Sequence, residues 1–146
     1  WEKLKLKEGK KSVLQGVPNS LPALIKAFRI QEKVRGVGFD WDDTKQVWNK
    51  VLEEIEELKF EVKKGNQDKI ESEFGDVLFA LINYSRFINV NPENALERTN
   101  KRFMKRFLIM EKLIKQDNLE LSDMNLQEMD IYWNKSKLLY LSEKKD

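Results

Sequence analysis

Glutamates crowd one stretch of the sequence, KVLEEIEELKFEV at residues 50–62, where five of them stand within nine positions. A second stretch, ESEFGDVLFALIN at residues 71–83, places further carboxylates ahead of an apolar run. Such sets suit two kinds of chemistry. They form solvated helix surfaces with lysine partners, or they converge and bind a hard divalent cation. The direction in which each carboxylate points decides between the two.

The chain of 146 residues contains no histidine and no cysteine. This excludes histidine-assisted serine catalysis, thiol nucleophiles, zinc fingers, iron–sulfur clusters and disulfides. A bound metal would have only oxygen ligands, which suits Mg²⁺ or Mn²⁺ better than zinc or copper. The 27 Lys and Arg residues nearly balance 25 Asp and Glu, and no apolar run approaches the roughly 20 residues of a membrane span. We therefore expect a cytoplasmic protein without nucleic acid polymers or membranes as partners.

The helical repeat separates the glutamates of the first stretch into two groups. At about 100° per residue, one apolar stripe forms on a helix over residues 44–63. This stripe contains Val47, Val51, Ile55, Leu58 and Val62. Glu54 and Glu57, with Lys50, border the stripe, whereas Glu53 and Glu56 lie roughly opposite it. We expect the opposite pair to be an ordinary solvated face, while the bordering pair is open to either chemistry.

The second stretch changes the balance between these alternatives. Its core stripe and much of the remaining surface are apolar, so we expect this helix to be buried nearly all round. Glu73 and Asp76, three residues apart, would then be desolvated unless they were paired or bound to a cation. A tight hairpin between the helices would bring four carboxylates together, and their mutual repulsion favours a divalent cation. The pattern therefore predicts a metal site formed by Glu54, Glu57, Glu73 and Asp76.

Basic and aromatic residues in the C-terminal third form a second candidate set. Arg102 and Arg106, one turn apart, border the apolar stripe of a helix and suit an anion with several oxygens. Lys137 interrupts an apolar face that also contains Trp133. For each of these cations taken alone, a structural role is about as well supported as anion binding. The arginines could be paired or stacked within the fold, and the lysine could reach out of the apolar stripe to water. Trp133 on its own is more typical of a core residue than of a nucleobase contact.

Helices joined by short loops must position these side chains. Glycine and proline are scarce and apolar residues recur every three or four positions, which predicts an all-α bundle of about four to five helices. We expect helices over residues 22–34, 44–63 and 92–114, with two further helices opened by capping boxes, Asp68 with Glu71 and Asn125 with Glu128. Gly65 is expected to end the second of these helices in the left-handed conformation. Residues 1–18 are interpreted as a linker to an absent N-terminal part, and residues 19–146 as the functional domain.

The ordered acidic motifs, Glu53-Glu54-x-x-Glu57 followed by Glu73-x-x-Asp76, resemble those of the MazG family of all-α nucleoside triphosphate pyrophosphohydrolases. The likeness extends over nearly the whole chain, from GVPNSLPALIKAFRIQEKVRGVGFDW to MNLQEMDIYWNKSK, and matches the C-terminal catalytic half of a two-repeat member. It implies a helical bundle that pairs into a homodimer. It also implies Mg²⁺ ligands at Glu54, Glu57, Glu73 and Asp76. Nucleotide contacts are implied at Arg102, Arg106, Trp133 and Lys137, with Lys50 and Asn83 as weaker candidates.

The resemblance implies hydrolysis of nucleoside triphosphates to monophosphates and pyrophosphate, with one glutamate accepting a proton from water. Spacing does not identify that base, and Glu53 qualifies only if its helix is turned further than expected. Arg102 departs from the lysine that is usual in the family. Two alternatives stay open: a narrower all-α enzyme of the dUTP or phosphoribosyl-ATP pyrophosphohydrolase type, and a non-catalytic binding or regulatory module.

Overall fold

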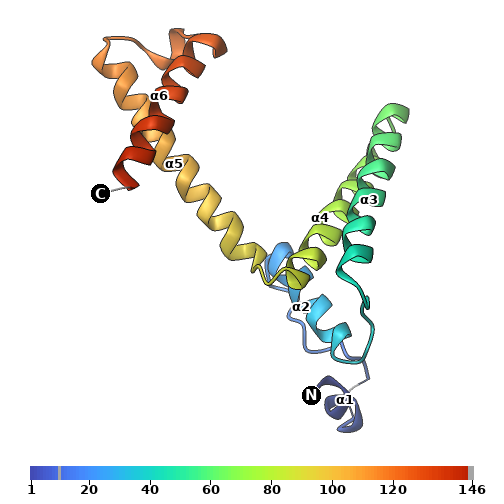
Figure 1. Cartoon of the computed structure of the whole chain (residues 1–146). Helices are drawn as coiled ribbons and strands as arrows, with labels where there is room; N and C mark the ends of the chain where they lie inside the picture. Colours follow the sequence, from blue (N-terminus) through green and yellow to red (C-terminus); the bar gives the residue numbers. More distant parts are fainter. Residues whose placement is uncertain (10, 145–146) are drawn as a thin grey trace. The chain divides into compact units, whose positions relative to one another are not determined.

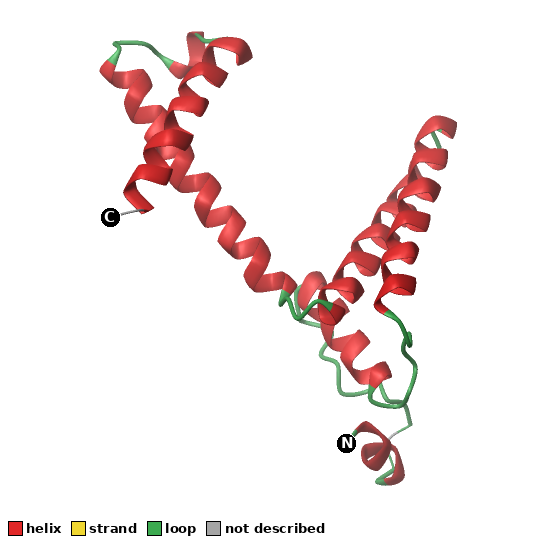
Figure 2. Cartoon of the chain, viewed as in Figure 1, coloured by secondary structure: helices red, strands yellow, loops and turns green. Residues whose placement is uncertain are grey.

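The computed structural model describes residues 1–9 and 11–144, except for the side chains of residues 5 and 6. All regular secondary structure in this part of the chain is helical (Figure 2), which confirms the all-α prediction. The elements are α1 (Glu2–Lys7), α2 (Ala23–Arg35), α3 (Thr44–Lys64), α4 (Gln67–Phe87), α5 (Pro92–Gln116), the short 3-10 helix η1 (Leu121–Asp123) and α6 (Leu126–Lys144). The chain divides into two compact units, Trp1–Glu93 and Asn94–Asp146.

The first unit is built around the antiparallel hairpin of α3 and α4 (Figure 1). Helix α3 ends at Gly65, whose φ of 78° is the left-handed conformation expected for this cap. The capping box expected at Asp68 is wrong, because the N-cap of α4 is Asn66. The Asn66 side chain accepts a hydrogen bond from the Lys69 backbone N–H, at 3.3 Å, and Asp68 lies in the first turn. The hairpin loop is therefore shorter than the sequence suggested.

The core of this unit lies where α3 packs along α4 and where α2 contacts α4. Val47 and Val51 are fully buried on α3, and Val77, Ala80 and Ile82 are buried on α4. These residues hold the two acidic helices in a fixed register, side by side.

The prediction that α4 is buried nearly all round is wrong. Phe74, Leu78 and Leu81 are exposed on the described chain. The reason is geometric, because α3 and α2 cover only part of the circumference of α4. The apolar end of the α3 stripe is also open, since Val62 is exposed. The hairpin therefore presents an uncovered apolar surface, which we call the hairpin face and define by Phe74, Leu78, Leu81 and Val62.

The second unit contains most of α5 together with η1 and α6, and the two long helices meet through the Phe103 and Trp133 side chains. Met110 and Ile114 of α5 are buried. The capping box expected at the start of α6 is confirmed, because the Glu128 N–H donates to Asn125 Oδ1 at 2.8 Å and the Asn125 N–H donates to Glu128 Oε1 at 3.4 Å. Within the described residues of the chain, none of the helices is long and apolar enough to cross a membrane.

Candidate metal and nucleotide site

Three of the four predicted metal ligands meet between α3 and α4. Glu54, Glu57 and Glu73 each offer one carboxylate oxygen, and these atoms all lie within 4.8 Å of one another. Glu54 is buried, Glu73 is half-buried and Glu57 is exposed. Asp76 lies one turn beyond Glu73 on α4, but its side chain is exposed and does not belong to this group. We call Glu54, Glu57 and Glu73 the carboxylate cluster.

Lys50 is the cation nearest to the buried member of the cluster. Its Nζ lies 3.0 Å from Glu54 Oε1 and 3.4 Å from Glu53 Oε1. The hydrogen bond to Glu54 is the main cause of a raised Lys50 pKa, against the opposing effect of burial. Lys50 therefore neutralises one oxygen of Glu54 and leaves the other to be satisfied elsewhere.

Two buried carboxylate oxygens of the cluster have no hydrogen-bond partner within the described structure, Glu54 Oε2 and Glu73 Oε2. Buried polar atoms are normally paired, because an unpaired one loses its hydration without compensation. The pKa of Glu57 is raised, first by the adjacent Glu54 carboxylate and then by burial and by the negative charges of Glu73 and Glu53. The cluster thus holds more negative charge than its protein surroundings neutralise.

This donor set fits a hard divalent cation. Every donor is a carboxylate oxygen, which is the ligand type of Mg²⁺ and Mn²⁺, and the two unpartnered oxygens, Glu54 Oε2 and Glu73 Oε2, are themselves buried atoms. The neighbouring glutamates behave differently, as the helical repeat predicted. Glu56 is exposed and pairs with Lys59 at 3.1 Å, while Glu53 is exposed and bonded to Lys50.

The four main residues predicted to contact the nucleotide all lie in the second unit: Arg102, Arg106, Trp133 and Lys137. The structure brings two of them together, because the Arg106 guanidinium stacks over the Trp133 ring with its carbon 4.6 Å from the ring centroid. Arg106 Nε is buried without a hydrogen-bond partner, and the Phe103 ring contacts Trp133 at 5.2 Å between centroids. The side chains of Arg102 and Lys137 are exposed. Arg106 therefore lies against the Trp133 ring with part of its hydrogen-bonding capacity unused.

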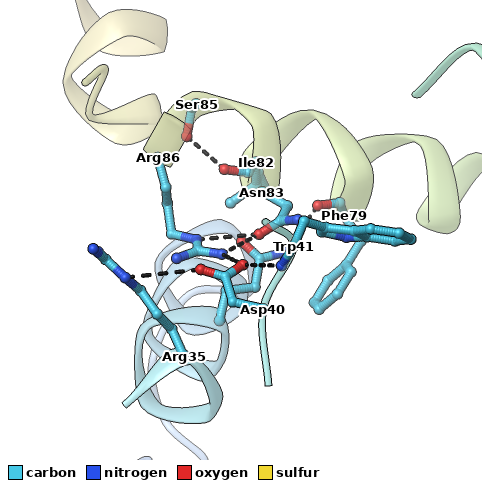
Figure 3. Close-up of polar contacts among 9 residues, drawn as sticks. Arg35, Asp40, Trp41, Phe79, Ile82, Asn83, Ser85 and Arg86 are labelled. Carbon is cyan, nitrogen blue, oxygen red and sulfur yellow. Dashed lines mark hydrogen bonds and ion pairs between the residues drawn. The ribbon is translucent and has the colours of Figure 1, made fainter. Parts of the chain in front are cut away.

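The sequence reasoning missed a polar network between α4 and the loop after α2 (Figure 3). Arg86 pairs with Asp40 at 3.0 Å and donates two hydrogen bonds to Asn83 Oδ1, one of them from Nε at 3.1 Å. Asp40 Oδ1 also accepts from the Trp41 backbone N–H at 2.9 Å. The sequence carried part of this signal, since Asn83 and Arg86 are three apart on one helix face, but not the partner 46 residues away.

Residues 43–118, which include the carboxylate cluster, match the MazG nucleotide pyrophosphohydrolase domain. The chain belongs to the MazG family. The matched region covers α3, α4 and α5, so the two acidic helices and the helix that carries Arg102 and Arg106 are all part of the MazG domain.

Named relatives agree with this MazG assignment. The chain is 46% identical over 140 residues to the nucleoside triphosphate pyrophosphohydrolase/pyrophosphatase MazG of Thermotoga maritima, and 37% identical over 143 residues to the nucleoside triphosphate pyrophosphohydrolase of Escherichia coli K12. Each match covers 94% of this chain and 54% of the relative. The chain is also 44% identical over 141 residues to the uncharacterized protein YabN of Bacillus subtilis, of which 29% is covered. The chain thus spans about half the length of the first two relatives.

Proposed function

We propose that the protein hydrolyses nucleoside triphosphates, ribo- or deoxyribo-, to nucleoside monophosphates and pyrophosphate. The observation that carries this proposal is the carboxylate cluster with its two unpartnered buried oxygens, located within a domain of the MazG family. The names of two relatives describe the same activity. Residues 19–146 are proposed as the catalytic domain.

Glu54, Glu57 and Glu73 would hold the cation, Mg²⁺ or Mn²⁺, and Asp76 is proposed as a fourth ligand. A turn of its side chain would bring the Asp76 carboxylate toward Glu73, because the two residues are one helical turn apart. When bound, the cation neutralises phosphate oxygens and lowers the pKa of bound water.

The remaining candidate residues are proposed to contact the nucleotide and its phosphates. Arg102, Arg106 and Lys137 would bind phosphate oxygens and stabilise the charge that develops as the bond to pyrophosphate breaks. Trp133 would contact the nucleotide, and the stacked, partly unsatisfied Arg106 beside it supports this role. Lys50 and Asn83 are secondary candidates.

A glutamate at the cluster would accept the proton of the attacking water. A base must reach that proton, and Glu53 lines one hollow with Glu57 and Glu73 while its carboxylate is bonded to Lys50. Glu53 and the members of the cluster are therefore all candidates for the base.

We also propose that the protein works as a homodimer. The hairpin face exposes Phe74, Leu78, Leu81 and Val62, and large apolar residues in contiguous exposed patches are typical of protein interfaces. The surface lies on the same two helices as the carboxylate cluster, so pairing through it would exclude water near the cluster.

The experiment is product analysis of the purified protein with ATP, GTP, CTP, UTP, dUTP and phosphoribosyl-ATP, with Mg²⁺ or EDTA. We expect pyrophosphate and monophosphate from several bases with Mg²⁺ and none with EDTA. Cleavage of dUTP or phosphoribosyl-ATP alone would favour the narrower enzymes. A folded protein that cleaves none of these compounds would contradict the proposal.

A further inference from the structure

A hollow of about 470 Å³ lies within the first unit between α2, the loop of residues 36–41 and α4. Its walls include three aromatic rings, those of Phe39, Trp41 and Phe79, and the aliphatic side chains of Ile30 and Val34. Sites for small molecules are typically apolar clefts of about 300–1,000 Å³ with a few placed polar groups. We call this hollow the α2–α4 pocket, and nothing in the proposed roles of the carboxylate cluster uses it.

The charged groups of the pocket already neutralise each other. Arg86, whose side chain is only 6% exposed, pairs with Asp40 at 3.0 Å, and Asp40 also pairs with Arg35 at 3.7 Å (Figure 3). The Arg86–Asp40 pair joins the loop of residues 36–41 to α4 and so holds this side of the pocket in place. An anion such as phosphate would have to compete with Asp40 for Arg86, so the pocket is better suited to an uncharged ring than to a phosphate.

Two amide side chains provide the polar groups for such a ring. Gln31 is 3% exposed, its Nε2 donates to the Phe79 carbonyl at 2.9 Å, and its Oε1 is buried without a hydrogen-bond partner. Asn83 Oδ1 already accepts two hydrogen bonds from Arg86, so the Asn83 amide nitrogen is the group left to donate. A ligand with a hydrogen-bond donor beside an acceptor on a flat edge would complement both amides, and nucleobases have such edges.

The position of the pocket along α4 relates it to the carboxylate cluster. Asp76 and Asn83 are seven residues apart, which is about two turns, so their side chains leave the helix in nearly the same direction about 10 Å apart along its axis. Phe79 lies between them and lines the pocket. A nucleotide extended along this face would have its phosphates near Glu73 and Asp76 and its base at the pocket.

We propose that the α2–α4 pocket binds the base of the nucleotide, with Phe39 and Trp41 as stacking surfaces and Gln31 and Asn83 as hydrogen-bonding groups. This inference rests on the proposed pyrophosphohydrolase activity. It extends that activity by placing base recognition on α2 and the loop of residues 36–41, which lie outside the region 43–118 matched by the family domain. Side chains in this segment would then set the preference among bases.

The test compares kcat and KM for the nucleotide panel in wild type, Phe39→Ala and Gln31→Leu. Phe39 is highly exposed, so its truncation should leave the fold intact. Base stacking on an aromatic side chain is typically worth enough to raise KM about tenfold when the ring is removed. We expect that rise with kcat nearly unchanged for Phe39→Ala, and an altered ranking of bases for Gln31→Leu. Leu126→Ala, an equally exposed apolar residue in the second unit, is the matched control and should change neither constant.

Inorganic tripolyphosphate separates base recognition from phosphate recognition. Its inhibition constant should be the same for wild type and both variants, because it has no base. Unchanged KM values in a folded Phe39→Ala and an unchanged ranking of bases in Gln31→Leu would overturn the inference while leaving the proposed activity intact. If wild type cleaves no nucleotide, the activity fails separately. In that case nucleoside binding is measured by Trp fluorescence. Weaker nucleoside binding by Phe39→Ala than by wild type would support base recognition in the α2–α4 pocket. Absence of nucleoside binding by wild type would contradict it.

Discussion

The carboxylate cluster brings like charges together at a cost in stability. Glu54, Glu57 and Glu73 gather negative charge, and only Lys50 lies beside them within ion-pair distance in the described structure. The raised pKa of Glu57 has its main cause in the neighbouring Glu54 carboxylate. Clustered like charges of this kind are retained in proteins where function requires them, although they weaken the fold.

The first prediction concerns Glu57→Gln in the absence of metal. The substitution removes one of three converging carboxylates, so the melting temperature in EDTA should rise by about 2 °C. Mg²⁺ should then stabilise the variant less than it stabilises wild type, because a ligand is lost. Glu56→Gln, on the solvated face of the same helix, is the control and should change neither value. A variant stabilised by Mg²⁺ as strongly as wild type would remove Glu57 from the site.

The second prediction concerns the pH dependence of stability in the second unit. Tyr132 donates a hydrogen bond to Asp117 at 2.5 Å, and this bond is the main cause of a raised Tyr132 pKa, followed by burial and the Asp117 charge. A raised folded-state pKa means that the stabilisation is fully present below the unfolded value of about 10 and is lost as the pH rises through the folded value. Absorbance titration at 295 nm should therefore show one late-titrating tyrosine.

Tyr132→Phe provides the comparison for this titration. The late step should disappear from the variant, and the variant should lose less stability than wild type between pH 9 and pH 12, which denaturant titration would measure. Tyr140→Phe is the matched control, because Tyr140 lies on the same helix and its ring contacts the Lys144 ammonium, 5.1 Å from the ring centroid. Persistence of the late step in Tyr132→Phe would contradict the assignment.

At the scale of elements, the sequence predicted most of the helices correctly. The helix expected over residues 44–63 is Thr44–Lys64, that expected over 92–114 is Pro92–Gln116, and the left-handed Gly65 and the Asn125–Glu128 box are confirmed. These features depend on local backbone chemistry, which a sequence carries directly. The capping error at Asp68 arose because two candidate caps, Asn66 and Asp68, lie two residues apart, and only the geometry after Gly65 selects Asn66.

The third prediction tests that cap. Asn66→Ala should lower the free energy of unfolding by about 1 kcal/mol, because the Lys69 N–H loses its side-chain acceptor. Asp68→Ala, two residues later, should have a smaller effect, since Asp68 interacts only with the helix dipole from the first turn. Urea denaturation measures both. Equal losses, or a larger loss at Asp68, would return the cap to the residue that the sequence suggested.

The α2–α4 pocket and the cluster geometry were harder to predict for a physical reason. The α3 stripe separated Glu54 from Glu53 and Glu56 correctly, because one helix fixes the directions of its own side chains. The pairing of Arg86 with Asp40 and the burial of Gln31 depend on how separate helices pack, and a single helical period carries no such information. The same limitation explains the error about the burial of α4.

At the scale of the whole molecule, the hairpin face is the clearest sign of a partner chain. Phe74, Leu78, Leu81 and Val62 are exposed on the two helices that carry the cluster. A helix this apolar is more stable with its surface covered, and a second copy of the chain is the partner that the MazG resemblance implies.

The fourth prediction follows from that surface. Light scattering during size-exclusion chromatography should give the mass of a dimer for wild type, and Phe74→Glu should shift it toward the 17.4 kDa monomer. Lys59→Glu, an exposed change of charge on α3, should leave the dimer intact. A monomeric wild type would contradict the proposed dimer, and a dimeric Phe74→Glu would move the interface to another surface.

The most direct test of the central claim is the product analysis of wild type beside the double variant Glu54→Gln/Asp76→Asn, with ATP and Mg²⁺. The account predicts AMP and pyrophosphate from wild type and a loss of at least about 100-fold in the double variant, as removal of metal-binding groups implies. Glu56→Gln should retain the activity of wild type. Release of orthophosphate and ADP, or full activity in a folded double variant, would contradict cleavage at this carboxylate site.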